Sequence, residues 1–470
     1  MSMPLRILLG SGSVILTLVV SLVPGASAAT TAGSLSFSNT TLTRPDGNSE
    51  PEISIGANGA MAMVGLQWLF NPAPGQFGTN LWTGPFGSTP AFQGIIDAGL
   101  QHPGKSVFGA GDADVDLAST GTLHATTLIF LYNPTFKKAQ LGVSAISCPN
   151  GTSGSVSISG CTRQIIDAAG ADRPWISSDG PHVYISYHDA ESSSLIHAQR
   201  SDDDGVTWKR IGDPIVGQGG ATGDATFNNI QGPIKADPFS HNVYDIYAAG
   251  ETGFLKARTF TPNQIVVSRS TDLGKSWTAN LVYAAPPGSV LANIFPALAV
   301  DPTNGHLYAA WSDGRTVSFA ASSDQGSTWS TPVSVNVAPA AAALMPWLAA
   351  YNGTVDLVYY GTTATSNLDP SAVWNVYLAQ TTNEGASFAQ SVVSNASNHA
   401  GIVCTGGTGC GPGTRNLLDL FQVAIDHQNG KAAVIYTDDA HATTTDPTSF
   451  SCLPGQTVCP LPQAVLAQQQ

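Results

Sequence analysis

The chain has 470 residues, of which 11% are charged and 49 are glycine, and its formal net charge is −14 at pH 7. An acidic chain of this kind is poorly suited to bind nucleic acid or an anionic membrane surface, so we expect neither as a partner. Because a single compact core rarely extends over so many residues, and because glycine favours turns, we expect many short strands in repeated units.

The first 28 residues predict a signal peptide. They contain Arg6, an apolar run from Val14 to Val23 and the small-residue segment Ala26–Ala28. The apolar run is too short to span a bilayer, and small residues after such a run are typical of a cleavage site. No later segment is long and apolar enough to span a membrane. We therefore expect a secreted protein without a membrane span, formed by residues 29–470.

Seven similar units follow along the chain. Each has an apolar strand, a turn and a second apolar strand. Six of the turns are centred on glycine, and Asn-Gly or Asp-Gly between apolar runs is typical of hairpins. The units repeat about every 62 residues, which exceeds the ~40–45 residues of a minimal four-stranded blade, so we expect long loops. The turns lie at Gly59, Gly121, Gly180, the longer segment 237–242, Gly305, Gly353 and Gly430.

The two ends of the chain are predicted to meet in one sheet. Third strands are expected at 195–199, 317–321 and 376–380, and residues 464–468 match them in sequence. The last unit therefore lacks an outer strand of its own, and residues 34–38 are the natural candidate to supply it. Pairing the two ends would remove open sheet edges, which promote aggregation.

A short turn pattern, Ser/Thr-x-Asp/Asn-x-Gly-x-Ser/Thr-Trp/Phe, occurs four times in the later units. The copies are Ser201–Trp208, Ser270–Trp277, Ser322–Trp329 and the weaker Thr381–Phe388. The acid can accept backbone N–H groups within the turn, the glycine supplies a positive φ, and the aromatic residue starts the next strand with its ring buried between sheets.

This pattern is the Asp-box (BNR repeat), and the chain resembles the β-propeller proteins of the sialidase-like superfamily that carry it. Together with the seven units, the resemblance implies an all-β fold: a single seven-bladed β-propeller over residues 29–470, with the N- and C-terminal strands in one blade. A six-bladed ring, as in sialidases, is the alternative.

The six cysteines form three close pairs in sequence: Cys148/Cys161, Cys404/Cys410 and Cys452/Cys459. An even number of cysteines in an exported chain predicts disulfides, and we expect each pair to close a local loop. A metal site is the competing interpretation, but neither Cys-x-x-Cys spacing nor paired histidines accompany these cysteines.

In Asp-box propellers the boxes lie on one face, and functional clefts open on the other. The resemblance therefore directs attention to the segments that start each first strand, among them Glu50–Glu52, and to the loops after each second strand. An Arg-rich cleft would hold a substrate carboxylate through planar bidentate donors. The predicted substrate-binding residues are Arg173, Arg315, Arg415, Asp172, Trp175, Asp313 and Trp347.

The sialidase resemblance also implies an acid and a nucleophile, and Tyr can serve as the nucleophile in this enzyme class. The predicted catalytic residues are Asp114 or Asp189 as the acid and Tyr187 or Tyr360 as the nucleophile. Asp116 and Asp419 are expected to cap turns. No cofactor is predicted, although Asp112, Asp114 and Asp116 alternate along the chain and offer oxygen ligands for a structural calcium ion.

Three functions remain open at this point. The first is a secreted sialidase-like glycoside hydrolase that acts on an extracellular glycan or glycoconjugate. The chain departs from sialidases because it has no Arg-Ile-Pro motif and only five Glu residues. The alternatives are a non-catalytic propeller that binds a glycan or a protein, and a polysaccharide lyase that uses Tyr187 and His188 beside Arg173.

Overall fold

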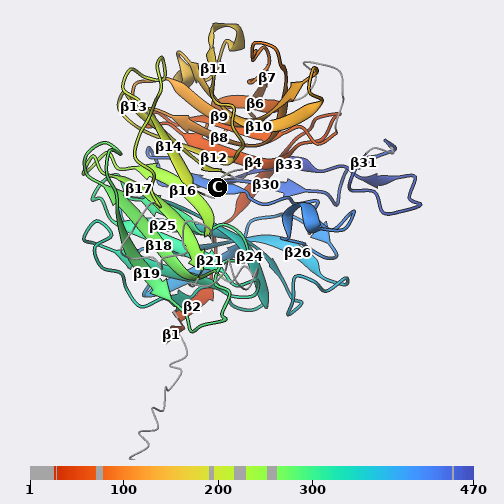
Figure 1. The fold of residues 1–470 in the computed structure, drawn as a ribbon. Helices are drawn as coiled ribbons and strands as arrows, with labels where there is room; N and C mark the ends of the chain where they lie inside the picture. Colours follow the sequence, from red (N-terminus) through yellow and green to blue (C-terminus); the bar gives the residue numbers. More distant parts are fainter. Residues whose placement is uncertain are drawn as a thin grey trace, which may run out of the picture.

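The computed structural model describes residues 26–27, 29–69, 78–189, 195–215, 229–250, 262–446 and 449–470. Seven sheets stand around a common axis as the blades of a β-propeller (Figure 1). The first strand of each blade contacts the first strand of the next, and β29 contacts β4 to complete the ring. In this part of the chain the helical segments are three short 3-10 turns, so the fold is all-β. The prediction of seven blades is confirmed, and the six-bladed alternative is wrong.

Each blade is a four-stranded antiparallel sheet whose first strand lies nearest the axis. Blades 1 and 2 comprise β4 (Ser49–Ile55), β5 (Ala60–Leu66), β6 (Thr79–Pro85), β7 (Ala91–Ile95), β8 (Ser106–Leu117), β9 (Leu123–Asn133), β10 (Lys138–Cys148) and β11 (Thr162–Asp167). Blades 3 and 4 comprise β12 (Ala171–Asp179), β13 (His182–Asp189), β14 (Ile196–Ser201), β15 (Lys209–Arg210), β16 (Asn229–Ala236), β17 (Val243–Gly250), β18 (Pro262–Ser270) and β19 (Thr278–Ala284). Blades 5 and 6 comprise β20 (Ala297–Val300), β21 (Leu307–Ser312), β22 (Val317–Ser322), β23 (Val333–Ser334), β24 (Ala342–Tyr351), β25 (Thr354–Thr362), β26 (Val373–Thr381) and β27 (Ser387–Val392).

Blade 7 combines strands from both ends of the chain. Its order is β29 (Gln422–Ile425), β30 (Ala432–Asp438), β33 (Gln463–Gln469) and β3 (Phe37–Leu42). β3 runs antiparallel to β33, with Phe37 opposite Gln469 and Leu42 opposite Ala464. Before it, β1 (Ala26–Ser27) and β2 (Ala29–Ala32) add parallel edge strands to blades 5 and 6. The rest of the predicted signal peptide, 1–25 and 28, lies outside the described residues.

Side chains of the first strands also join neighbouring blades. Ser54 Oγ accepts the Leu117 backbone N–H at 2.9 Å, Asp114 Oδ2 accepts that of Ile176 at 2.9 Å, and Ser177 Oγ accepts that of Ala236 at 3.0 Å. These bonds satisfy backbone donors that face the axis, where no further strand can pair with them. The start of one blade is thereby tied to the next.

The four repeat turns, at residues 201–208, 270–277, 322–329 and 381–388, have one common geometry. In the third, Asp324 accepts the Ser322 hydroxyl (2.9 Å), the Thr328 N–H (2.8 Å) and the Thr328 hydroxyl (2.7 Å). Gln325 and Gly326 both have positive φ, 60° and 78°. Asn383 replaces the acid in the fourth turn, and its amide donates to Ser387 Oγ at 2.9 Å.

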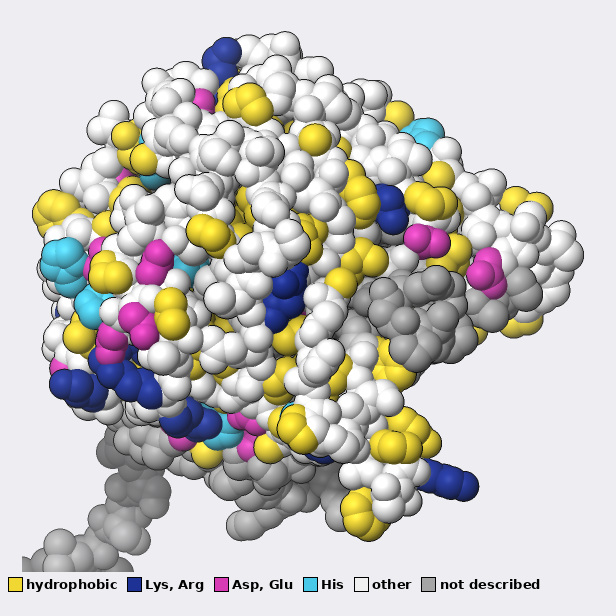
Figure 2. Space-filling view, turned by 90° about the horizontal axis from the view of Figure 1, so that it is seen from above, with side chains coloured by type: hydrophobic (Ala, Val, Ile, Leu, Met, Phe, Trp, Pro, Cys, Tyr) yellow, Lys and Arg dark blue, Asp and Glu magenta, His cyan; other side chains and the backbone are white. Residues whose placement is uncertain are grey.

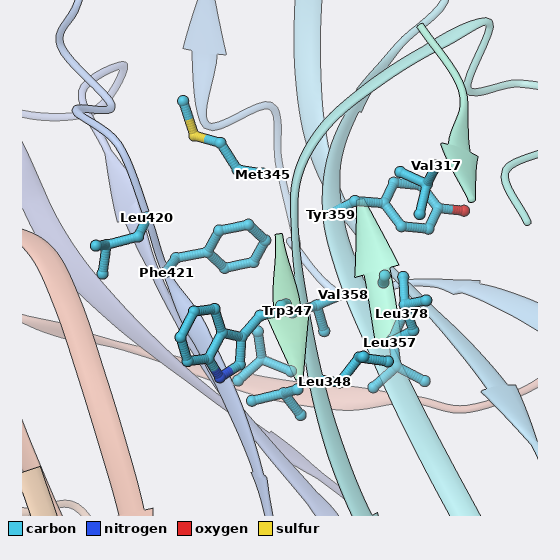
Figure 3. Close-up of a cluster of buried hydrophobic side chains, with 14 of the residues drawn as sticks. Val317, Met345, Trp347, Leu348, Leu357, Val358, Tyr359, Leu378, Leu420 and Phe421 are labelled. Carbon is cyan, nitrogen blue, oxygen red and sulfur yellow. The ribbon is translucent and has the colours of Figure 1, made fainter. Parts of the chain in front are cut away.

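The largest hydrophobic core lies between the later blades. Figure 3 shows Trp347 and Phe421 next to each other, with Met345 above them and Tyr359 toward the neighbouring strands. Trp347 follows the bulge of β24 and belongs to this core, which includes side chains of blades 3 to 7.

All three cysteine pairs are disulfide-bonded as predicted: Cys148–Cys161, Cys404–Cys410 and Cys452–Cys459. The first bridge connects β10 to β11, where blades 3 to 6 have a repeat turn instead. The third supports the β31 (Thr443–Thr444) and β32 (Cys459–Pro460) hairpin, which projects from the ring at the right of Figure 1.

The surface is sparsely charged, as the composition implies. Figure 2 shows a face that is mostly uncharged, with its densest group of acidic, basic and histidine side chains at the left edge. The described residues include no helix with the length and hydropathy of a membrane-spanning segment.

Candidate functional site

Strained backbone positions gather where the first strands begin. We call the face on which β4, β8, β12, β16, β20, β24 and β29 begin the start face, and the face that carries the repeat turns the turn face. Positive φ occurs at Glu50 (45°), Arg173 (53°), Met345 (53°) and Leu418 (55°), each at or just before a first strand. Such angles are rare for residues other than glycine and persist where the surroundings enforce them, often at functional sites.

Bulges accompany these angles. The register shifts between Ser49 and Glu52 in β4, between Asp172 and Trp175 in β12, and between Leu344 and Trp347 in β24. A bulge bends its strand and re-aims the side chains beside it. The same combination of a bulge and a residue with positive φ therefore recurs in three first strands on the start face, where it directs particular side chains toward the axis.

Six charged side chains meet at this place, and we call them the axial cluster. They are Glu50, Asp112, Asp172, Arg173, Arg415 and Asp419, contributed by blades 1, 2 and 3 and by the segment before β29.

Direct contacts hold the axial cluster together. Arg415 Nε donates to Asp419 Oδ1 at 3.0 Å, and its Nη2 donates to Asp419 Oδ2. The Asp419 backbone N–H donates to Glu50 Oε1 at 3.0 Å. Arg173 Nε lies 3.6 Å from Asp172 Oδ2. The Asp172 side chain is 30% exposed and that of Asp419 is 14% exposed, whereas Glu50 is 3% exposed. Asp172 is therefore the most accessible of these three acids.

The pKa values of two acids in the cluster are raised. Burial, followed by the charges of Asp112 and Asp419, holds the pKa of Glu50 well above its usual range. Burial and the charges of Asp172 and Asp419 raise the pKa of Asp112 to about 6, although a hydrogen bond from Glu50 opposes the increase. Glu50 therefore holds its proton more strongly than an ordinary glutamic acid, and its carboxyl group is hydrogen-bonded to Asp112. Pairs of carboxyl groups with different protonation are the usual basis of acid–base catalysis at a glycosidic bond.

Aromatic rings lie beside the cluster on the axis. The ring centroids of Trp175 and Trp347 are 5.2 Å apart in a stacked arrangement, and Phe295 meets Trp175 edge-on at 5.7 Å. Arg173 lies over the Phe295 ring at 5.4 Å. Trp175 and Trp347, both predicted to bind substrate, are 1% and 4% exposed. Their rings are therefore packed in the interior beneath Arg173 and the starts of the first strands.

A cavity of about 230 Å³ follows the axis toward the turn face. Asp114, a predicted acid, lines it and is 3% exposed; its Oδ1 accepts the Val115 N–H and its Oδ2 that of Ile176, both at 2.9 Å. Asp116 accepts the Ser178 hydroxyl in the same cavity, so Asp112, Asp114 and Asp116 have separate partners. Within the described ranges, no group of three or more His, Cys, Asp or Glu side chains is arranged to hold a metal ion.

Two other predicted catalytic residues, Tyr187 and Asp189, lie together in a hollow of about 220 Å³ at the edge of the start face. We call it the blade 3 hollow, and it is lined by Asp167, Ala169, Gly170, Ala171, Tyr187, Asp189, His197 and Arg210. The Tyr187 hydroxyl donates to Asp167 Oδ2 at 2.7 Å, and burial raises its pKa further above the ordinary value. His197 Nε2 lies 3.4 Å from Asp189 Oδ2.

His188 lies between the hollow and the axial cluster. Burial and the neighbouring charge of Arg173 lower its pKa to about 3, so its ring is neutral at physiological pH. Its Nδ1 is buried and has no hydrogen-bond partner among the described residues.

The remaining predicted residues lie elsewhere. Tyr360 is fully buried, accepts the Thr437 N–H at 3.0 Å and packs on Phe421 with ring centroids 4.1 Å apart. Arg315 and Asp313 are exposed in the loop after β21, where Asp313 accepts the Arg315 backbone N–H at 2.9 Å. The structure thus brings together Asp172, Arg173 and Arg415 in one cluster, whereas Arg315 lies in the loop after β21 of blade 5.

Glu50, Asp112 and Asp419 are the residues that the sequence interpretation did not assign to the site. Asp419 was expected to cap a turn, but its carboxylate binds the Arg415 guanidinium. A sequence pattern could have pointed to this place, since Glu50-Pro51, Arg173-Pro174 and Met345-Pro346 all stand at the bulged start of a first strand.

Comparison with known proteins gives likenesses in structure alone. No family model matches the sequence, and no curated protein matches it either. A protein of unknown function from Dyadobacter fermentans has a TM-score of 0.49 at 12% identity, over 92% of this chain and 98% of that chain. The intramolecular trans-sialidase from Ruminococcus gnavus has a TM-score of 0.42 at 11% identity, over 92% and 96% of the two chains.

An α-L-arabinofuranosidase from Fusarium graminearum has a TM-score of 0.43 at 12% identity, over 70% of this chain and 93% of that chain. Likenesses at this level carry no argument about activity. The functional proposal below therefore depends on the residues of the axial cluster.

Proposed function

We propose that this chain is a secreted Asp-box propeller that hydrolyses glycosidic bonds of an extracellular glycan or glycoconjugate at the axial cluster. The observation that carries the proposal is a carboxyl group with a raised pKa, Asp112, that is hydrogen-bonded to Glu50 and close to the charges of Asp172 and Asp419. Glycosidases require such a pair, in which one acid protonates the leaving oxygen and one carboxylate acts at the anomeric carbon.

Asp112 is the proposed general acid. It is more accessible than Glu50, and its pKa of about 6 keeps a proton available in mildly acidic surroundings. Glu50 is a positioning residue. Its carboxyl group is hydrogen-bonded to Asp112 and accepts the Asp419 backbone N–H, and these two bonds hold the carboxyl groups of Glu50 and Asp112 in place. A proton from Asp112 passes to the glycosidic oxygen as the bond to the anomeric carbon breaks.

Asp172, the most exposed carboxylate that pairs with an arginine in the cluster, is the proposed partner on the other side of the sugar. It either forms a bond to the anomeric carbon or takes a proton from the attacking water, and the stereochemistry of the product distinguishes these routes. Asp419, bound to Arg415 by two hydrogen bonds, stabilises positive charge that develops on the sugar ring.

The lyase alternative has weaker support. A lyase base must take a proton from the substrate, but the Tyr187 hydroxyl is buried, donates to Asp167 and has a raised pKa. A non-catalytic propeller remains the alternative that the experiment below distinguishes.

The test is release of reducing sugar from a panel of polysaccharides and aryl glycosides by the purified protein and by Asp112→Asn. Loss of a general acid lowers turnover by ~10²–10⁴-fold. Asp116→Asn is the matched control, because Asp116 lies four residues along the same strand and bonds to Ser178 in the axial cavity. Glycan binding without turnover by the unaltered protein would support the binding alternative.

A further inference from the structure

We infer that the axial cluster accepts a glycan that is uncharged at the reacting sugar and rejects carboxylated sugars such as sialosides and uronates. The inference rests on the proposed function and concerns the substrate class of the same site. It departs from the sialidase-like expectation, in which arginines hold a substrate carboxylate.

The two arginines of the cluster already have anionic partners. Arg415 binds both carboxylate oxygens of Asp419, and Arg173 lies 3.6 Å from Asp172 while its guanidinium covers the Phe295 ring. A substrate carboxylate would have to displace Asp419 from Arg415 or compete with Asp172 at Arg173, whose Nε has no hydrogen-bond partner among the described residues. The displaced acid would then stay in a part-buried position without its counter-charge, which is unfavourable.

Acids outnumber arginines in the axial cluster. It contains four carboxyl groups and two guanidinium groups, so the two arginines are already matched by Asp172 and Asp419 when Glu50 and Asp112 carry protons, and an excess negative charge appears once Asp112 ionises. The carboxyl groups influence one another, since Asp112 is affected by both Asp172 and Asp419. An additional carboxylate at this place would be repelled by the same charges.

The other nearby cations do not reverse this balance. Arg315 lies in the exposed loop after β21, and it is not among the main charges that shift the pKa values of Glu50 and Asp112 within the described residues. Lys235 lies in the axial cavity, 5.5 Å from the Trp347 ring and beside Glu52 and Asp116. Hydroxyl groups of a neutral sugar, in contrast, can donate hydrogen bonds to Asp172 and Asp419.

The experiment compares neutral and acidic substrates in matched pairs with the purified protein. Polysaccharide probes are debranched arabinan, β-1,4-galactan and xyloglucan against polysialic acid, polygalacturonate and hyaluronan. Small probes are 4-methylumbelliferyl arabinofuranoside and galactoside against the N-acetylneuraminic acid and glucuronic acid derivatives. We expect kcat/KM on at least one neutral probe to exceed that on every acidic probe by ~100-fold or more. Faster cleavage of an acidic probe would overturn the inference while supporting the proposed function.

Absence of cleavage on all probes would overturn the proposed function, and binding to the same polysaccharides then decides the inference. Binding to a neutral glycan and not to its acidic counterpart supports it, whereas binding to the acidic member, or to neither, overturns it. The two proposals therefore fail in different ways.

A charge variant tests the physical cause. Asp172→Asn keeps the side-chain shape but leaves Arg173 without its partner, so affinity for N-acetylneuraminic acid and glucuronate should rise ~10-fold relative to neutral sugars. Asp419→Asn provides a second variant with the same expectation at Arg415. Glu384→Gln is the matched control, because Glu384 is exposed in the fourth repeat turn on the turn face. Unchanged discrimination in folded Asp172→Asn and Asp419→Asn proteins would contradict the charge argument.

Discussion

Burial and the nearby charges of Asp172 and Asp419 raise the pKa of Asp112 to about 6. If Asp112 is the general acid, kcat/KM should decrease as the pH rises through about 6, because the acid loses the proton that it must deliver. Replacing Asp419 by Asn removes a charge that raises this pKa, so the decreasing limb should move to lower pH. Rate measurements between pH 4 and pH 8 check both statements, and a limb that stays in place in Asp419→Asn would count against the assignment.

Asp245 in β17 provides a test of stability that is independent of the site. It is fully buried, and neither carboxylate oxygen has a hydrogen-bond partner among the described residues, although Ser186 lies near enough to favour the ionised form. Burial raises its pKa to about 8. The folded state therefore keeps a proton between about pH 4 and pH 8 that the unfolded state has lost, and stability falls as the pH rises through this window.

Asp245→Asn removes this penalty. We expect the variant to gain stability over the unaltered protein as the pH rises from 5 to 8, by about 1.4 kcal/mol per pH unit at most. Thermal denaturation at several pH values measures the difference. A gain that does not depend on pH would show that packing, rather than ionisation of Asp245, is responsible.

At the scale of single residues, the sequence predicted the location of side chains on the start face better than it predicted the contacts that these side chains make. Arg173 and Arg415 were placed correctly on the start face because they stand at predicted strand starts. The partners of Asp114 could not be predicted, since its bond to the Ile176 N–H depends on how blades 2 and 3 dock. The raised pKa of Asp112 depends in the same way on acids that are distant in the chain.

Each repeat turn connects the third strand of a blade to the fourth, in blades 3 to 6. In the third turn, Asp324 accepts hydrogen bonds from Ser322 and from both the N–H and the hydroxyl of Thr328. Asp324→Ala should lower the free energy of unfolding by about 1–2 kcal/mol, because the buried Ser322 hydroxyl and the two exposed Thr328 donors lose their acceptor. Ser323→Ala, an exposed change in the same turn, is the control, and equal effects in chemical denaturation would contradict the role of Asp324.

The turn pattern was the most informative part of the sequence at this scale. Side-chain identity at three positions determines the turn hydrogen bonds locally, so all four copies have one geometry. The positive φ of Asp204, Leu273, Gln325 and Glu384, just before each glycine, was not foreseen. The positive φ follows from the backbone path of the turn. Because four different residue types stand at this position, the sequence does not reveal it.

For the whole molecule, the number of blades followed from six glycine-centred turns and the longer turn at 237–242, because each first hairpin is local in sequence. The pairing of β3 with β33 makes a further test possible. Removing residues 29–42 should expose the edge of β33, lower the melting temperature and promote aggregation, since an open edge strand pairs with other chains. Removing residues 29–32 alone deletes β2 and keeps β3, so it is the control in melting and light-scattering measurements.

The same pairing has a consequence for the time course of folding. Arg44 and Gln463, which bond to each other beside the β3–β33 ladder, are 419 residues apart. Closing a loop of that length costs about 5 kcal/mol of chain entropy, and contacts so distant in sequence form slowly. Blades 1 to 6 are built from hairpins that can form early, whereas blade 7 must wait until residues 463–469 have been synthesised. We therefore expect ring closure to be the last and slowest step, with β3 unpaired until then.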